Sequence, residues 1–231
     1  MRPERFAAGE YYHIYNRGVE KRPIFYDDQD RSRFLSLLLL FQGDFSFQQI
    51  TRFKPCVQHR MLDIHSLPRE IERKIMRTRV VELNGFIFMK NHFHLMAREQ
   101  KDGGVSKFMQ RLGNAYTKYF NIKYRRRGHL FEGKFNASHV DKNEYLLYLS
   151  AYIHLNVREV PRWRGHEETY QWSSFKDYMA ENRFGKLLNS SIVLRQFEKK
   201  QEYKNFVKES DIKNFEQIFD VQHRMLDRGT R

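Results

Sequence analysis

The sequence predicts an α+β fold in which helices pack against an antiparallel sheet. Two observations indicate this fold class. Segments rich in β-forming residues alternate with segments of helical periodicity in the order β, α, β, β, α, β, α. The two central strands are separated only by the turn Lys90-Asn91, and a connection this short joins antiparallel neighbours. Together they predict the split βαβ, or ferredoxin-like, arrangement.

The first strand and the first helix have clear boundaries. Residues 11–17 (YYHIYNR) are rich in β-formers and stop at Gly18, which predicts a strand. The acidic run 27–30 precedes a helical segment at 31–41, and acidic side chains favour a helix N-terminus. Gly43 then ends the predicted helix.

A hairpin and a long amphipathic helix follow. Residues 80–89 are apolar and β-like, and 92–98 form the return strand. Gly103 and Gly104 break the chain. Residues 105–124 then carry apolar side chains at helical spacing, which predicts a helix with one buried face.

The last core strand and helix are predicted from residues 130–140 and from the segment that ends near Val157. Gly133 lies within the predicted strand and favours a bend or the approach of a ligand. Asp141 is the expected N-cap of the helix, and Glu144 completes a capping box with it.

Two regions extend the core. Segment 45–79 is an expected insertion, with a charged helix at 69–77. After Pro161, residues Trp163, Trp172 and Phe175 are expected to anchor the chain back onto the core. We therefore expect a catalytic domain at 1–180 and a peripheral helical extension at 181–231 with few core residues. The heptapeptide VQHRMLD occurs at both 57–63 and 221–227, and nothing in its pattern explains the repeat.

Composition narrows the class of partner. The chain has 231 residues, 42 of them Lys or Arg and 28 Asp or Glu, which gives a formal net charge of +14. Such an excess favours a polyanionic partner through phosphate contacts and counterion release. A single cysteine excludes an internal disulfide, and neither a membrane-spanning run nor a secretory signal is apparent. A cytoplasmic location is expected.

The strand at 92–98 opens with the pattern His92-Phe93-His94. Strand side chains alternate between faces, so the two imidazoles share one face while Phe93 and Leu95 point to the apolar core. Two histidines do not complete a metal site. An oxygen ligand, phosphate and water would complete one suited to Mg²⁺ or Mn²⁺, and the single cysteine argues against a closed zinc site.

The following helix carries three tyrosines on one stripe. Tyr145 is expected to be a core residue, whereas spacing alone does not separate Tyr148 from Tyr152. Tyr152 is favoured because Asn156 lies one turn later on the same face and offers an amide oxygen to the metal. His154 points elsewhere, as a structural residue or a DNA contact.

This combination favours phosphodiester chemistry on nucleic acid. A phenol has an ordinary pKa near 10 and needs a polarised electrophile, which a metal-bound phosphate provides. Aromatic residues from Tyr116 to Tyr124 run into Arg125, Arg126 and Arg127, a mixture suited to single strands, although most of these rings are expected to be buried.

The chain resembles the HUH-type tyrosine transposases, in the branch associated with REP sequences. The resemblance extends over most of residues 8–180 as an ordered set of short motifs: YHIYNRG at 12–18, IFYDD at 24–28, MKNHFHL at 89–95, GHLFEG at 128–133, AYIHLN at 151–156 and WSSF at 172–175.

The resemblance implies that His92, His94 and Asn156 bind Mg²⁺ or Mn²⁺ and that Tyr152 is the nucleophile. It also implies nicking and joining of single-stranded or hairpin DNA through a 5′-phosphotyrosine link, by a monomer or a homodimer. A non-catalytic, domesticated nucleic-acid-binding protein of the same fold is the alternative, and a phosphoesterase that uses water ranks last. Expected DNA contacts are Asn16, Arg17, Tyr116, Arg125, Arg126, Arg127 and Lys134.

Overall fold

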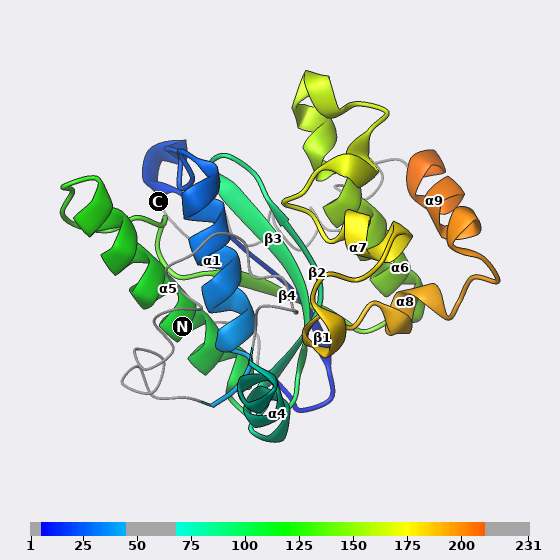
Figure 1. Ribbon diagram of the computed structural model, residues 1–231, viewed down its shortest axis with the longest axis horizontal. Helices are drawn as coiled ribbons and strands as arrows, with labels where there is room; N and C mark the ends of the chain where they lie inside the picture. Colours follow the sequence, from blue (N-terminus) through cyan, green and yellow to red (C-terminus); the bar gives the residue numbers. More distant parts are fainter. Residues whose placement is uncertain (1–5, 45–67, 211–231) are drawn as a thin grey trace.

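A four-stranded antiparallel sheet separates two layers of helices (Figure 1). The computed structural model describes residues 6–44 and 68–210. Its strand order is β2-β3-β1-β4, which is the order of a split βαβ sheet. The predicted fold class is therefore confirmed. The repeated heptapeptide lies outside the described residues.

The strands are β1 (Tyr11–Arg17), β2 (Val81–Phe88), β3 (His92–Glu99) and β4 (Asn136–Val140). β1 lies in the centre and pairs antiparallel with both β3 and β4. The first three agree with the predicted segments. The fourth is shorter than expected, because positive φ angles at Gly128 and Gly133 make the preceding residues a loop.

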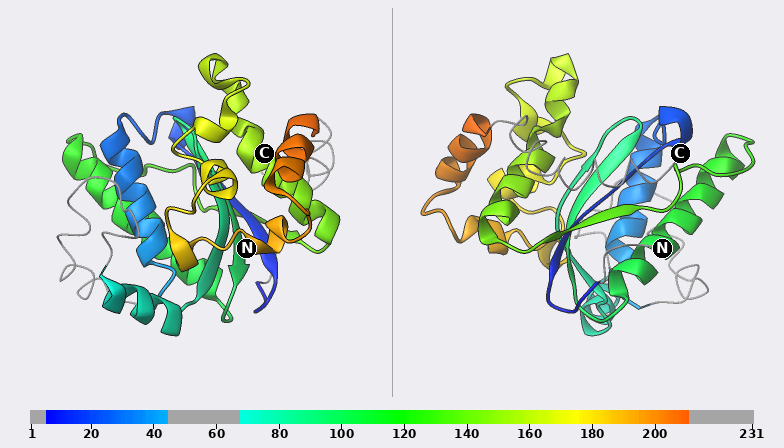
Figure 2. Two further views of the ribbon diagram at one scale, coloured as in Figure 1. Left: turned by 45° about the vertical axis from the view of Figure 1, so that its right-hand side comes forward. Right: turned by 180° about the vertical axis from the view of Figure 1, so that it is seen from behind.

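One face of the sheet is covered by α1 (Asp28–Leu40) and α5 (Gly104–Lys123), as Figures 1 and 2 show. The N-terminus of α1 has a capping box in which the Asp27 side chain accepts from the Asp30 backbone N–H. Lys123 near the end of α5 pairs with both carboxylates, at 2.7 and 2.8 Å. These contacts tie the two helices together over the apolar face of β3.

The other face is covered by α6 (Asn143–Leu155), with α7 (Phe175–Met179), α8 (Ser191–Leu194) and α9 (Lys200–Glu209) around it (Figure 2). The predicted capping box at Asp141 and Glu144 is wrong. The N-cap is Lys142, and no side chain caps the helix. The expected continuation to Val157 is also wrong in form, because a 3₁₀ turn replaces the α-helix from Asn156.

The predicted helix in the insertion is confirmed as α4 (Arg69–Arg77). The anchoring role expected after Pro161 is confirmed for Trp172 and Phe175, which are buried, whereas Trp163 is half-buried. No helix among residues 6–44 and 68–210 is long and apolar enough to cross a membrane. The remaining short 3₁₀ elements are Val19–Lys21, Asn156–Glu159, Pro161–Trp163, Glu167–Thr169 and Gly185–Leu187.

The extension contributes more to the core than its composition predicts. Tyr203 and Val207 of α9 are fully buried, so the expectation of few core residues is wrong for this helix. Its charged residues are exposed except Lys204, which is half-buried and paired with Glu168. The two buried positions are four residues apart and share one face, which packs against α6.

Candidate functional site

Strand pairing places the two predicted histidines on the α6 face of the sheet. His94 lies directly opposite Tyr15 of β1, and His92 lies opposite Arg17. Phe93 points to the other face and is 1% exposed. The predicted division of β3 into a histidine face and an apolar face is therefore confirmed.

The tyrosine helix brings Tyr152 onto the histidines of the same chain. The Tyr152 and His94 rings are 5.2 Å apart, edge to face. One turn later, Asn156 Oδ1 lies 3.1 Å from His92 Nε2. Tyr148 instead packs against Phe206, with ring centroids 5.7 Å apart. The fold thus separates two tyrosines that spacing left together.

The contacts of His92 indicate a position for a cation. Asn91 donates its side-chain N–H to Lys21 O and turns its oxygen to His92 Nδ1, 2.7 Å away. Burial lowers the pKa of His92, while its contact with Asn156 acts in the opposite direction. A neutral imidazole has one N–H and one nitrogen with a lone pair, but both ring nitrogens of His92 face an amide oxygen. One of the two contacts therefore places the lone pair of a ring nitrogen against that of an oxygen. A metal ion near Nε2 and the Asn156 oxygen would satisfy both.

The residues available to such an ion are two imidazoles and one amide. Within the described parts of the chain, no cluster of three His, Cys, Asp or Glu side chains could hold a metal. His92, His94 and Asn156 therefore offer an incomplete set with mixed nitrogen and oxygen donors. Such a set suits a divalent ion that also accepts phosphate oxygens or water.

His13 belongs to the site and was missed from the sequence. Its Nε2 lies 2.9 Å from His94 Nδ1, and both rings are buried. A bond to Nδ1 orients the His94 ring and leaves Nε2 for a ligand, as the hydrogen-bond partners of metal-binding histidines do. The alternation of side chains along β1 was the only sequence signal for His13, and it becomes informative only once β1 is known to lie beside β3.

Tyr15 is a second phenol next to the histidines. Its ring is stacked 5.7 Å from that of His94 and 4.9 Å from that of His13. Like Tyr152, it is half-buried. The two tyrosines approach His94 from different elements, and the geometry alone makes both of them candidate nucleophiles.

His154 is structural. It is fully buried, and its two ring nitrogens are hydrogen-bonded to Ser174 Oγ at 2.9 Å and to the Tyr203 hydroxyl at 2.7 Å. Ser174 in turn accepts from Phe86 N of β2. These bonds pin α6 between the sheet and α9 two residues beyond Tyr152. The alternative that His154 contacts DNA is wrong.

The expected DNA contacts differ in exposure. Tyr116 is wrong as a contact, because its ring is 0% exposed and its hydroxyl donates to Ile24 O at 2.6 Å. Asn16 is also buried, and its oxygen accepts from Arg17 N. Arg17 is half exposed and paired with Glu132. The remaining four are exposed or half-buried on the loop after α5: Arg125, Arg126, Arg127 and Lys134.

Comparison with known proteins supplies independent information. Residues 44–156 match the model of the family described as "Transposase IS200 like". No curated protein matches the chain. One solved structure, described as a REP-associated tyrosine transposase bound to a REP hairpin, is similar at 12% identity and a TM-score of 0.48, over 83% of this chain and 92% of the other.

The family match covers both histidines, the tyrosine helix and Asn156. It supports a transposase-like, DNA-processing role for the chain. Residues 44–156 are therefore similar to IS200-like transposases, in agreement with the resemblance to tyrosine transposases inferred from the motifs.

Proposed function

We propose that this protein nicks and rejoins single-stranded, hairpin-forming DNA through a covalent bond to Tyr152. The observation that carries the proposal is the convergence of four side chains within one chain. Tyr152 contacts His94, and Asn156 contacts His92, without help from a second subunit. A monomer therefore holds every residue of the proposed site.

In the proposed step, the Tyr152 oxygen attacks a backbone phosphorus. An O–P bond to the tyrosine forms, and the bond from phosphorus to the 3′-oxygen breaks. The phenol loses a proton and the 3′-oxygen gains one, so the step conserves protons as well as phosphoester bonds. Attack by a 3′-hydroxyl on the phosphotyrosine reverses it, which makes joining as accessible as cutting.

His92, His94 and Asn156 would hold Mg²⁺ or Mn²⁺, whose charge polarises the phosphate and orients it toward the phenol. His13 keeps the His94 ring in place, and the bonds of His154 keep α6 against the sheet. The protein's contribution is thus to fix the direction of attack.

The test is covalent trapping on a labelled hairpin oligonucleotide with unpaired flanks, in the presence of Mn²⁺. We expect an adduct that resists denaturing electrophoresis and that maps to Tyr152 by mass spectrometry. Tyr152→Phe should abolish it, while Tyr15→Phe and Tyr148→Phe should retain it. EDTA should prevent its formation.

An adduct that persists in Tyr152→Phe and disappears in Tyr15→Phe would transfer the nucleophilic role to β1. Salt-sensitive binding without any adduct in the wild type would favour the non-catalytic nucleic-acid-binding alternative. Release of cut DNA without a trapped protein would favour attack by water.

A further inference from the structure

Asn91 lies in the turn between β2 and β3, directly before His92, and its side chain makes two contacts. Its Nδ2 donates to Lys21 O at 3.1 Å, and its Oδ1 lies 2.7 Å from Nδ1 of His92. A backbone carbonyl oxygen can only accept a hydrogen bond, so the amide directs its N–H group to Lys21 and its oxygen to His92. The contact with Lys21 therefore fixes which way round the Asn91 amide lies.

The turn that supplies this carbonyl has an unusual backbone. It spans residues 18–22, and both Glu20 and Lys21 have positive φ angles, of 54° and 57°. Residues other than glycine seldom adopt this left-handed conformation, which persists where surrounding contacts require it. A Cβ on Gly18 would lie 2.0 Å from Arg22 O, so the turn also closes tightly on itself.

Backbone hydrogen bonds hold this turn on two sides. Gly18 N donates to Asn91 O at 2.8 Å, which ties the turn to the start of β3. Val19 N donates to Leu130 O at 3.0 Å, which ties it to the loop that leads into β4. The position of Lys21 O relative to Asn91 is therefore set by the fold rather than by the amide that it accepts from.

The orientation of Asn91 decides where the proton of a neutral His92 ring lies. An amide oxygen 2.7 Å from Nδ1 accepts a hydrogen bond, so Nδ1 carries the proton and Nε2 carries the lone pair. Nε2 then faces Asn156 Oδ1 at 3.1 Å with no hydrogen between them. Of the two contacts of His92, the one with Asn156 is therefore the unfavourable one, and it is the one that a cation would relieve.

From these observations, we propose that Asn91 is a positioning residue for His92. It holds the ring as the Nδ1–H tautomer and thereby presents the Nε2 lone pair beside Asn156, where a divalent ion would bind. The turn at 18–22 acts through Asn91, because Lys21 O fixes the direction of the amide. This assignment rests on the proposed function, since it takes His92 and Asn156 as ligands of the ion.

The first test reads the tautomer from the ¹⁵N chemical shifts of the His92 ring in metal-free protein, with His92→Ala to identify the signal. We expect the Nδ1–H form in the wild type and in Asn91→Asp, whose carboxylate accepts the same bond. Asn91→Leu should change to the Nε2–H form, in which the ring donates to Asn156 instead. An Nε2–H ring in the wild type, or an unchanged tautomer in Asn91→Leu, would overturn the proposal.

The second test measures the affinity for Mn²⁺ alone, without DNA, from the electron paramagnetic resonance of the free ion. Asn91→Leu should bind Mn²⁺ roughly 10- to 100-fold more weakly than the wild type, the usual cost of losing a residue that orients a metal-binding histidine. Asn91→Asp should keep the affinity. Lys21→Gly should keep it as well, because only the backbone carbonyl of residue 21 is used and glycine adopts the positive φ freely.

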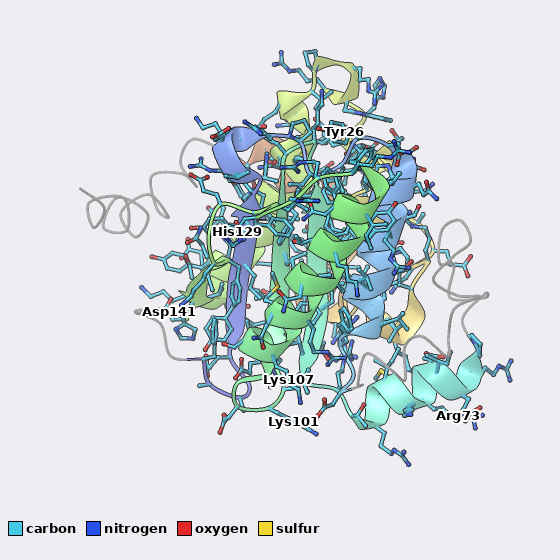
Figure 3. All side chains as sticks on the ribbon, turned by 90° about the vertical axis from the view of Figure 1, so that its left-hand side faces the viewer. Tyr26, Arg73, Lys101, Lys107, His129 and Asp141 are labelled. Carbon is cyan, nitrogen blue, oxygen red and sulfur yellow. The ribbon has the colours of Figure 1, made fainter. Side chains whose placement is uncertain are left out.

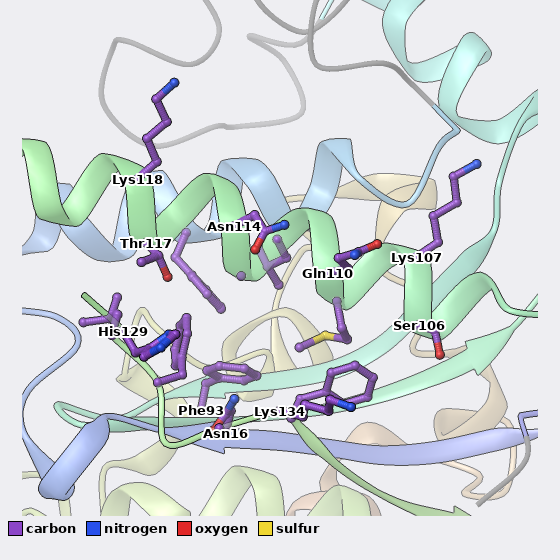
Figure 4. A pocket seen from close by; sticks show the side chains of 18 residues that line it. Asn16, Phe93, Ser106, Lys107, Gln110, Asn114, Thr117, Lys118, His129 and Lys134 are labelled. Carbon is purple, nitrogen blue, oxygen red and sulfur yellow. The ribbon is translucent and has the colours of Figure 1, made fainter. Parts of the chain in front are cut away.

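The matched control is Asn114→Leu, the same chemical change on the other side of the sheet. Asn114 and Gln110 are exposed on α5, where they border a cavity of about 970 Å³ (Figure 4). Figure 3 looks onto this side of the molecule, with α5 in front of the sheet. Both the His92 tautomer and the Mn²⁺ affinity should be unchanged in this variant.

Three results of the Mn²⁺ measurement would contradict the positioning role: no binding by the wild type, equal losses in Asn91→Leu and Asn114→Leu, or a loss in Lys21→Gly as large as that in Asn91→Leu. Urea unfolding of each variant separates a local effect from a loss of the fold. Failure of the proposed function would appear differently, as a wild type that has the expected tautomer and binds Mn²⁺ but forms no adduct with DNA.

Discussion

The two faces of the sheet are formed by the same strands but differ in the side chains they present and in how these are packed. On the α6 face, His13, His94, Tyr15 and Tyr152 contact one another through rings and a hydrogen bond. On the α5 face, a well-packed apolar core gives way to an open cavity with exposed amides. The α6 face thus brings the proposed reacting groups into contact, whereas the α5 face leaves polar side chains exposed.

The difference follows from strand periodicity. Successive side chains along β3 point to opposite faces, so His92 and His94 lie on the α6 face while Phe93, between them, lies on the α5 face. A change at one face should then leave the other intact. Two of the four substitutions below, His94→Ala and Tyr116→Phe, test that separation, and the other two test residues that support the α6 face.

The largest effect is expected from His94→Ala. The change removes a proposed ligand and the partner of both His13 and Tyr152, so adduct formation should fall by more than about a thousandfold. Binding of a hairpin with unpaired flanks should persist, because the expected DNA contacts at 125–127 lie on the loop after α5, away from the histidines. Adduct yield and hairpin affinity, measured on the same preparation, separate the two. Parallel losses would show that the faces are not independent.

A smaller loss of adduct formation is expected from His13→Gln. The ring of His94 would keep its place in the strand but lose its orienting bond to Nδ1. Loss of a residue that orients a metal-binding histidine typically costs about 10- to 100-fold in metal affinity or activity. A titration with Mn²⁺ should show a higher metal requirement and a partly restored adduct at saturation. An unchanged Mn²⁺ dependence would contradict the orienting role.

His154 should make the protein sensitive to acid. Burial lowers its pKa to about 3, below the ordinary value of 6.5. As pH falls below 6.5, the unfolded chain takes up a proton that the folded site refuses, and stability is lost. At about 1.4 kcal/mol per pH unit, the loss at pH 5 is about 2 kcal/mol. Urea unfolding of the wild type and of His154→Gln, at neutral pH and at pH 5, measures this loss of stability, which the variant should not show.

The smallest effect is expected from Tyr116→Phe. The ring is buried on the α5 face, and only its hydroxyl bond to Ile24 O is lost. Stability should fall by about 1 kcal/mol, with DNA affinity unchanged. A marked drop in affinity for single strands would restore Tyr116 as a DNA contact and contradict its burial.

Much of the site was accessible from local spacing. Residues two apart on a strand share a face, which defined the His92 and His94 pair, and residues four apart on a helix share a face, which joined Tyr152 to Asn156. Capping was harder to predict. The expected box at Asp141 is absent, whereas Asp27 and Asp30 form one at the start of α1, and Lys123 at the end of α5 and the adjoining Tyr124 also contact Asp27.

By itself the sequence determined the strand order along the chain, the division of β3 between two faces and the presence of a histidine pair with a helical tyrosine. Only the tertiary structure decided which tyrosines approach that pair, and it added His13 and the cavity under α5. The physical reason is distance along the chain. His13 and His94 are 81 residues apart, and such a contact arises from strand pairing, which leaves no periodic trace in either segment.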